Sequence, residues 1–216
     1  MTRAWIARSV CAVTLTLGCA STASAQALDD IGVRGFAIVG NMTFTAKDSF
    51  EAVLDRRSGP IFGGGGQVLL PWNIYVEIGA WRFEQEGERV FVGPNDEVFK
   101  LGIPLDITIT PLEVTGGYRF TMLSPKFTPY AGVGYSAYRY QETSEFADPD
   151  EDVDETFSGF HVQAGAEYQL LRWLAVGGEV AWSSIAGAIG QGGVSAQFNE
   201  DNLGGTSLRL KVSVGR

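Results

Sequence analysis

Residues 158–183, SGFHVQAGAEYQLLRWLAVGGEVAWS, alternate between apolar residues and small or polar ones. A period of two predicts β-strands whose two faces meet different surroundings. The pattern breaks at Leu171–Arg172, which indicates two strands joined by a tight turn. Their apolar positions are Phe160, Val162, Ala164, Ala166, Tyr168 and Leu170, then Leu174, Val176, Val180 and Trp182. The fold therefore depends on which face of such strands is buried, and against what.

Stretches of this kind occur eight times along the 216 residues of the chain. They lie at about 35–44, 62–70, 74–80, 112–120, 131–138, 159–170, 174–183 and 207–214. Three connections are short, at 70–73, 122–126 and 171–172, and four are long, at roughly 45–59, 85–104, 142–156 and 185–203. In an up-and-down meander all short turns then lie at one end and all long loops at the other. This asymmetry is typical of outer-membrane barrels.

The first stretch has its apolar set at Phe36, Ile38, Met42 and Phe44. These four residues are predicted to share the apolar face with the corresponding sets of the other strands. The segment that follows, Ala46–Asp55, is predicted to form a helical turn within the first long loop.

Two other segments break the alternation. Ile107 and Ile109 are out of phase with Leu112, which predicts a β-bulge near Pro111. Residues 81–83 are likewise out of phase with the stretch before them, and the alternation gives no reason for it.

The second face of the strands distinguishes two kinds of barrel. A soluble barrel turns its apolar face inward and needs charged residues on the face that meets water. The second face here is mostly Gly, Ala, Ser, Thr and Gln, with an occasional charge, and the charged residues lie in the loops instead. Small residues fit the narrow lumen of eight strands, so the apolar face is predicted to meet lipid. The predicted fold class is all-β: an eight-stranded antiparallel up-and-down transmembrane β-barrel.

Aromatic residues flank the short turns. Trp72 and Trp173 lie at two of these turns, and Tyr118 and Phe120 lie beside the third. Membrane barrels carry aromatic girdles at both interfaces. These four residues are therefore predicted to form the girdle on the periplasmic side.

Two motifs carry a resemblance to a known family. The segments TGGYRF, residues 115–120, and PYAGVGY, residues 129–135, resemble strands of the small outer-membrane β-barrel proteins of Gram-negative bacteria, namely the OmpA-like transmembrane domain and the OmpW-type and opacity-type proteins. The resemblance covers the mature chain and implies the outer membrane as location, with outer-membrane lipid and the barrel insertion machinery as partners. The chain departs from that group by ending on Val214-Gly215-Arg216 rather than on an aromatic residue.

The first 25 residues are predicted to be a removed secretory signal peptide, which leaves residues 26–216 as the barrel domain. Arg3 and Arg8 precede a short apolar run, and Ala23-Ser24-Ala25 forms an A-x-A cleavage site, with cleavage after Ala27 as the alternative. Cys11 and Cys19 both lie in this segment, so the mature chain has no thiol or disulfide chemistry. The formal net charge of −9 without basic clusters predicts no nucleic-acid partner.

The second face also places charged residues inside the predicted lumen: Glu77, Glu113, Arg119, Glu167, Glu179, Arg209 and Lys211. Charges in a filled barrel have to be paired, since a lone buried charge costs several kcal/mol. Counting along the strands places Glu179 level with Arg209, and Gln67 opposite Glu77. The set is predicted to be a structural network that fills the lumen, with a gate for small solutes as the alternative.

No catalytic, cofactor or metal site is predicted. Outer-membrane lipid A deacylases, which resemble this fold, use a lipid-facing His-x-Ser with a carboxylate, whereas the only histidine here stands in His161-Val162-Gln163 and faces the lumen. The acidic loop 142–156 lacks the glycine and glutamate positions of an EF-hand and is predicted to be solvated, with weak, nonspecific binding of divalent ions as the alternative.

The predicted function is structural, or surface interaction through the long loops with an unknown ligand. A narrow channel for small or apolar solutes is the first alternative, and a lipid-modifying enzyme is a distant one.

Overall fold

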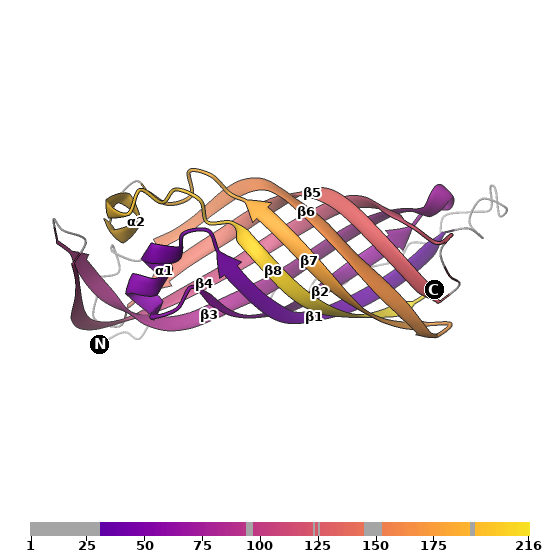
Figure 1. The fold of residues 1–216 in the computed structure, drawn as a ribbon, viewed down its shortest axis with the longest axis horizontal. Coiled ribbons are helices and arrows are strands. Elements are labelled where there is room, and N and C mark those ends of the chain that lie inside the picture. The colour runs from indigo at the N-terminus through magenta and orange to yellow at the C-terminus, as the bar shows by residue number, and fades with distance from the viewer. Residues whose placement is uncertain (1–30, 94–96, 123, 125, 145–152, 191–192) are drawn as a thin grey trace, which may run out of the picture.

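The computed structural model describes residues 31–93, 97–122, 124, 126–144, 153–190 and 193–216. Its strands tilt around one long axis and close into a single barrel (Figure 1). The predicted signal peptide, residues 1–25, lies outside the described residues. The strands are β1 (Gly32–Phe44), β2 (Ser58–Leu69), β3 (Ile74–Val92), β4 (Val98–Arg119), β5 (Phe127–Thr143), β6 (Val153–Leu171), β7 (Leu174–Ser184) and β8 (Gly205–Gly215).

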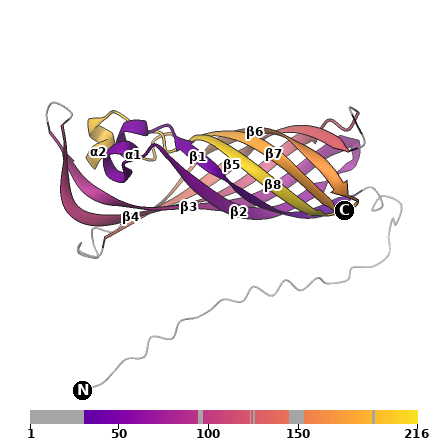
Figure 2. The ribbon, with the colours of Figure 1, turned by 60° about the horizontal axis from the view of Figure 1, so that its bottom comes forward.

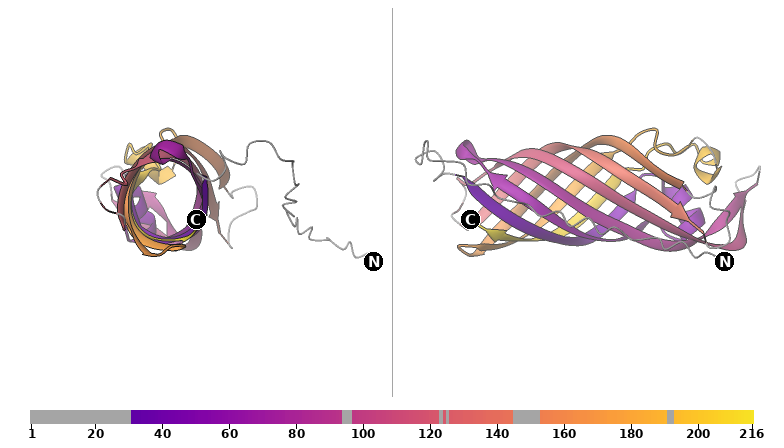
Figure 3. Two further views of the ribbon diagram at one scale, coloured as in Figure 1. Left: turned by 90° about the vertical axis from the view of Figure 1, so that its right-hand side faces the viewer. Right: turned by 180° about the vertical axis from the view of Figure 1, so that it is seen from behind.

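The sheet has no free edge along the barrel wall, because β1 pairs with both β2 and β8. Each strand is antiparallel to its two neighbours, and the order around the barrel follows the sequence. Viewed along the axis, the strands form a closed ring, and the view from behind shows the same tilt (Figure 3). The predicted fold class is confirmed.

The two ends of the barrel differ as predicted, but the expected long loop at 85–104 is wrong, because β3 and β4 continue as a paired hairpin through most of it. At one end, hereafter the short-turn end, the turns after β2, β4 and β6 are short, and the turn after β2 is the 3₁₀ turn η1 (Pro71–Asn73). The other end, hereafter the long-loop end, carries the helices α1 (Lys47–Leu54) and α2 (Gly193–Gln197). The hairpin of β3 and β4 extends beyond the other strands there (Figure 2). The predicted helical turn is confirmed as α1.

Apolar side chains cover the outside of the barrel wall. The residues of this apolar belt include Phe62, Ile78, Leu112, Val114, Val133, Tyr135, Phe160, Val162, Val180, Trp182, Leu208, Leu210 and Val212, all of them exposed. The alternating positions on the same strands, such as Glu113 and Arg209, are buried. In β2 to β8 the predicted apolar sets at this level therefore face outward, as expected for lipid contact.

This polarity reverses toward the long-loop end. There Trp81, Phe83 and Ile109 point inward and are buried, while Arg82 and Glu84 point outward. The strands continue past the apolar belt, so their outer face meets water and their inner face becomes an apolar core. This reversal explains why the apolar residues at 81–83 are out of phase with Ile78. The strand itself keeps its regular alternation, and only the face that carries apolar residues changes.

The predicted bulge near Pro111 is wrong for the same reason. The register of β4 with β5 runs without a shift from Asp106 to Arg119. Ile107 and Ile109 differ in phase from Leu112 because they face the inner core, whereas Leu112 faces outward. The irregularity in this hairpin lies instead between Glu88 and Val90 of β3.

The predicted orientation of the first strand is also wrong. Ile38, Met42 and Phe44 are buried inside the barrel and Phe36 also faces inward, while Val39 lies on the outside. Both faces of β1 carry apolar residues, and Val33, Ala37 and Val39 are the ones that face outward. Alternation alone therefore does not show which face of this strand meets lipid, and the predicted set lies in the lumen instead.

Arginine substitutions test where the apolar belt ends. Val180→Arg places a charge in the belt and is expected to lower the free energy of unfolding by about 2–4 kcal/mol. Thr108→Arg also points outward, but above the belt and opposite Glu84, so we expect a change of less than about 1 kcal/mol. Urea unfolding in lipid vesicles measures both. Equal losses would show that the belt extends over Thr108.

Candidate functional site

The lumen of the barrel contains two groups of buried charges. The central charge cluster consists of Glu77, Glu113, Glu179, Arg209 and Lys211, and the mouth charge cluster, nearer the short-turn end, consists of Arg34, Arg119 and Glu167. The structure thus places all seven sequence-predicted lumen residues inside the barrel.

Arg209 organises the central charge cluster. Its Nη1 and Nη2 donate to the two carboxylate oxygens of Glu113, at 2.9 and 3.1 Å, across the lumen. Nη1 also lies 3.4 Å from Oε1 of Glu179, which is its register partner on β7. Nε donates to Ser207 at 2.8 Å, and the guanidinium carbon lies 5.7 Å from the centre of the Trp81 ring. The structure brings Glu179 and Arg209 together, but the bidentate partner of Arg209 is Glu113.

Lys211 joins the remaining carboxylates. Its Nζ lies 2.5 Å from Oε2 of Glu77 and 3.6 Å from Oε2 of Glu179. The same ammonium sits 4.3 Å from the centre of the Phe36 ring, a cation–π geometry. Gln67 donates to Glu77 at 2.9 Å, so these two residues lie opposite each other as the strand count predicts. These carboxylates and the aromatic ring compensate Lys211 for the hydration that its ammonium group loses on burial.

The mouth charge cluster is built on Glu167. Arg34 Nη1 and Arg119 Nη2 both bind its Oε2, at 3.1 and 2.9 Å, and Ser213 donates to its Oε1 at 3.4 Å. Arg34 lies two residues before Phe36 and therefore on the same face of β1. The sequence prediction places that face toward lipid, so it omits Arg34 from the lumen. Correct orientation of β1 places Arg34 in the lumen.

Uncharged polar side chains fill the space between the charges. Tyr130 donates to Glu179 at 2.9 Å. His161 is fully buried and hydrogen bonded through its two ring nitrogens to Thr115 and Ser136, both at 2.7 Å. A side chain at Gly134 would meet the His161 ring at 2.5 Å, so this glycine is required for the imidazole to fit. The histidine is thus a satisfied lumen residue, as the sequence indicates.

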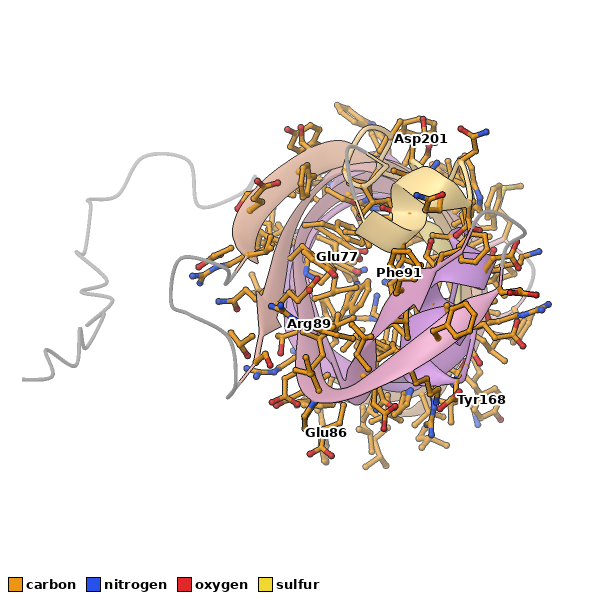
Figure 4. All side chains as sticks on the ribbon, turned by 90° about the vertical axis from the view of Figure 1, so that its left-hand side faces the viewer. Glu77, Glu86, Arg89, Phe91, Tyr168 and Asp201 are labelled. Atoms are coloured by element: carbon orange, nitrogen blue, oxygen red, sulfur yellow. The ribbon has the colours of Figure 1, made fainter. Side chains whose placement is uncertain are left out.

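An apolar plug closes the lumen above the central charge cluster. Phe44 stacks on Phe50 of α1 with a centroid distance of 4.1 Å, and Phe83 packs edge-on against Phe44 at 4.9 Å. The plug is completed by Met42, Ile61, Trp81, Leu105, Ile107, Ile109, Tyr138, Ile185 and Leu203. Seen from the long-loop end, Glu77 points into the barrel, whereas Glu86 and Tyr168 point away from it (Figure 4).

Helix α1 is held on the plug by a carboxylate from the last long loop. Glu200 accepts hydrogen bonds from the backbone N–H of Asp48 at 3.1 Å and of Ser49 at 2.8 Å, and from the Ser49 hydroxyl at 2.6 Å. A carboxylate at the first turn of a helix satisfies free N–H groups and interacts favourably with the helix dipole. Two long loops are thereby joined over the lumen.

A cavity of about 950 Å³ lies at the long-loop end beside α1. Apolar side chains from α1, the β3–β4 hairpin and β6 line it, among them Phe50, Val53, Leu101 and Phe157. Arg89 also lines it and can be followed in Figure 4. Such a size and lining are typical of sites for small molecules.

The acidic loop 142–156 is described only at its two ends, since residues 145–152 lie outside the described residues. On the exposed surface at its base, hydrogen bonds from Arg139 lower the pKa of the Asp154 carboxyl. In the described part of the chain no group of acidic and histidine side chains has the arrangement of a metal site, and none of the described helices is long and apolar enough to cross a membrane.

The family model for the outer membrane protein β-barrel domain matches residues 15–215, nearly the whole chain. The chain belongs to this family. The outer-membrane location predicted from the sequence is therefore confirmed, as is the resemblance to small outer-membrane barrels. No curated protein matches the sequence.

Solved outer-membrane barrels are similar to this chain at low sequence identity, and Neisserial surface protein A shares its fold. Neisserial surface protein A is 14% identical, with a TM-score of 0.52 over 86% of this chain and 96% of that one. The N-terminal β-barrel domain of Pseudomonas aeruginosa OprF is 11% identical, with a TM-score of 0.44 over 86% and 99%. Ail, the attachment invasion locus protein of Yersinia pestis, is 11% identical, with a TM-score of 0.47 over 86% and 99%.

Aromatic side chains surround the short-turn end. The structure places Trp72, Tyr118, Phe120 and Trp173 there with exposed side chains, and the rings of Tyr118 and Phe120 contact each other edge-on at 5.1 Å. This placement suits a girdle at a membrane interface. The assignment of this end to the periplasm remains a prediction.

A double-mutant cycle tests which partner holds Arg209. Because Arg209 forms two short hydrogen bonds with Glu113 and one long one with Glu179, we expect a coupling of about 1–3 kcal/mol between Arg209→Gln and Glu113→Gln. Coupling with Glu179→Gln should be smaller. Unfolding in detergent measures all the variants. A larger coupling for the Glu179 pair would contradict the bidentate geometry.

Proposed function

We propose that this outer-membrane barrel is non-conducting and presents its long-loop end at the cell surface for interaction with other molecules. The observation that carries the proposal is the filled lumen. The central charge cluster occupies the middle of the barrel, and the apolar plug lies above it. A solute would have to displace both layers.

The space left between these layers supports a closed barrel. A cavity lined by Phe36, Ile38, Glu77 and Glu113 measures about 10 Å³. This volume holds roughly one water molecule. A space of this size is too small to form a path for ions through the charged layer.

The contacts of Arg209 also argue against a simple gate. Its movement away from Glu113 would break buried ion pairs, which is costly, and would leave the plug around Phe44 and Phe83 in place. Opening the lumen would further require α1 to leave its contacts with Glu200. The channel alternative is therefore the weaker one.

The long-loop end offers surfaces for binding. Phe91, Phe99 and Leu101 of the β3–β4 hairpin are exposed beyond the barrel wall, and the cavity of about 950 Å³ opens beside them. Exposed apolar groups on an otherwise polar surface often mark interaction sites. A role as a surface protein fits these features better than catalysis, because the one histidine, His161, is sealed in the lumen.

Conductance measurements in planar bilayers test the closed lumen. The wild-type protein is expected to give no channel steps. Arg209→Gln should lower the stability of the barrel and still give none, because the apolar plug remains. A general porin inserted in the same bilayer serves as the positive control. Steps in Arg209→Gln but not in the wild type would establish a gate and overturn the proposal.

Surface labelling tests the orientation. Glu97→Cys lies at the tip of the β3–β4 hairpin, and Met122→Cys lies at a short turn with 91% of its surface exposed. A membrane-impermeant maleimide added to intact cells should label Glu97→Cys only. Met122→Cys should react once the outer membrane is opened. The reverse pattern would place the long-loop end in the periplasm.

A further inference from the structure

The charges in the lumen balance overall but are distributed unevenly. The central charge cluster holds three carboxylates and two cations, whereas the mouth charge cluster holds two guanidiniums and a single carboxylate. Among the described residues, the mouth therefore carries an excess of positive charge at the short-turn end. Lys126 and Arg172, in the turns around this opening, add to it.

The two guanidiniums of the mouth are incompletely bonded. Both form an ion pair with the same oxygen of Glu167, and the Arg119 side chain is only 8% exposed. Within the described part of the chain, Arg119 Nη1 and Arg34 Nε are buried and have no hydrogen-bond partner. Buried donors of a charged group without acceptors are costly. An additional acceptor at this position would remove that cost.

A cavity of about 250 Å³ lies at the short-turn end beside these two arginines. Arg34 and Arg119 line it, together with the hydroxyl and amide side chains of Thr121, Thr128 and Gln169. None of the described residues that line it is acidic. Its polar lining can thus donate several hydrogen bonds to one bound group while the arginines supply the charge.

We propose that this mouth cavity binds a phosphate-type oxyanion, with Arg119 and Arg34 as its charged ligands. Guanidinium groups suit phosphate because their N–H groups match its oxygens in pairs. The phosphate can be free in the aqueous phase or belong to a lipid headgroup of the leaflet at this end. The site is independent of the closed lumen and of any ligand at the long-loop end.

Phosphate binding to the folded mature protein tests the site. The probe is inorganic phosphate, titrated into protein in maltoside micelles at constant ionic strength and followed by calorimetry and by the melting temperature. The wild type should bind and melt at a higher temperature as phosphate increases. Loss of one charged donor in Arg119→Gln should weaken binding by about tenfold or more. Arg82→Gln removes the same charge from the outer surface of β3 and should bind like the wild type.

A second variant, expected to bind phosphate more tightly, keeps the test decisive if Arg119→Gln folds poorly. Glu167→Gln removes the carboxylate that both arginines share, so phosphate should bind about tenfold more tightly. Absence of binding to the wild type, equal binding to Arg119→Gln, or an equal effect of chloride would overturn the proposal. Weaker binding to Glu167→Gln would overturn it as well.

The source of the phosphate is distinguished by repeating the titration in phosphatidylglycerol nanodiscs. Weaker apparent binding than in micelles would show that lipid headgroups occupy the site. Equal binding in both would identify a free phosphate as the ligand.

Discussion

The structure depends on the need to pair every backbone N–H and C=O group within the bilayer. Hydrocarbon offers no hydrogen bonds, so strands can cross a membrane only in a closed sheet. The pairing of β1 with β8 closes this one. Closure of eight strands fixes a narrow bore, which side chains have to fill. Inward positions in the middle of the barrel are thereby committed to packing or to pairing a charge, which is why His161 and Arg209 have such complete sets of partners.

The same closed sheet serves two surroundings along its length. Around Val180 and Leu210 the outside is apolar and the inside is polar, as lipid requires. Around Phe83 and Ile109 the inside is apolar and the outside is polar, as in a soluble barrel. The strands run through this boundary without changing their alternation. The long-loop end is thus a small soluble-type core continuous with the membrane barrel, and α1 is its cover.

The level at which the outer face changes from apolar to polar is one feature that the sequence alone does not reveal. Alternation and connection lengths suffice for the number of strands, their order and most of the lipid face. They do not show where lipid ends, which is why the change of phase near Pro111 suggests a bulge. They also do not orient β1, because Val33, Ala37 and Val39 on one face are as apolar as Phe36 and Ile38 on the other. Taking the Phe36 face as the lipid face leaves Arg34 out of the predicted lumen. The bond between Arg209 and Glu113 was missed for another reason. Strand counting aligns neighbours such as Glu179, whereas Glu113 lies across the lumen on β4.

Contacts across the lumen give the barrel a stiffness that its wall alone would lack. Arg209 of β8 reaches Glu113 of β4, Lys211 of β8 reaches Glu77 of β3, and Arg34 of β1 reaches Glu167 of β6. None of these strands are neighbours in the sheet. Because separating a buried pair leaves two poorly hydrated charges, each bond resists flattening or widening of the barrel. The wall below the long loops is therefore rigid. A rigid wall holds α1, α2 and the β3–β4 hairpin in fixed relative positions at the long-loop end. A binding surface made of separate loops has one defined shape only if those loops are held in this way.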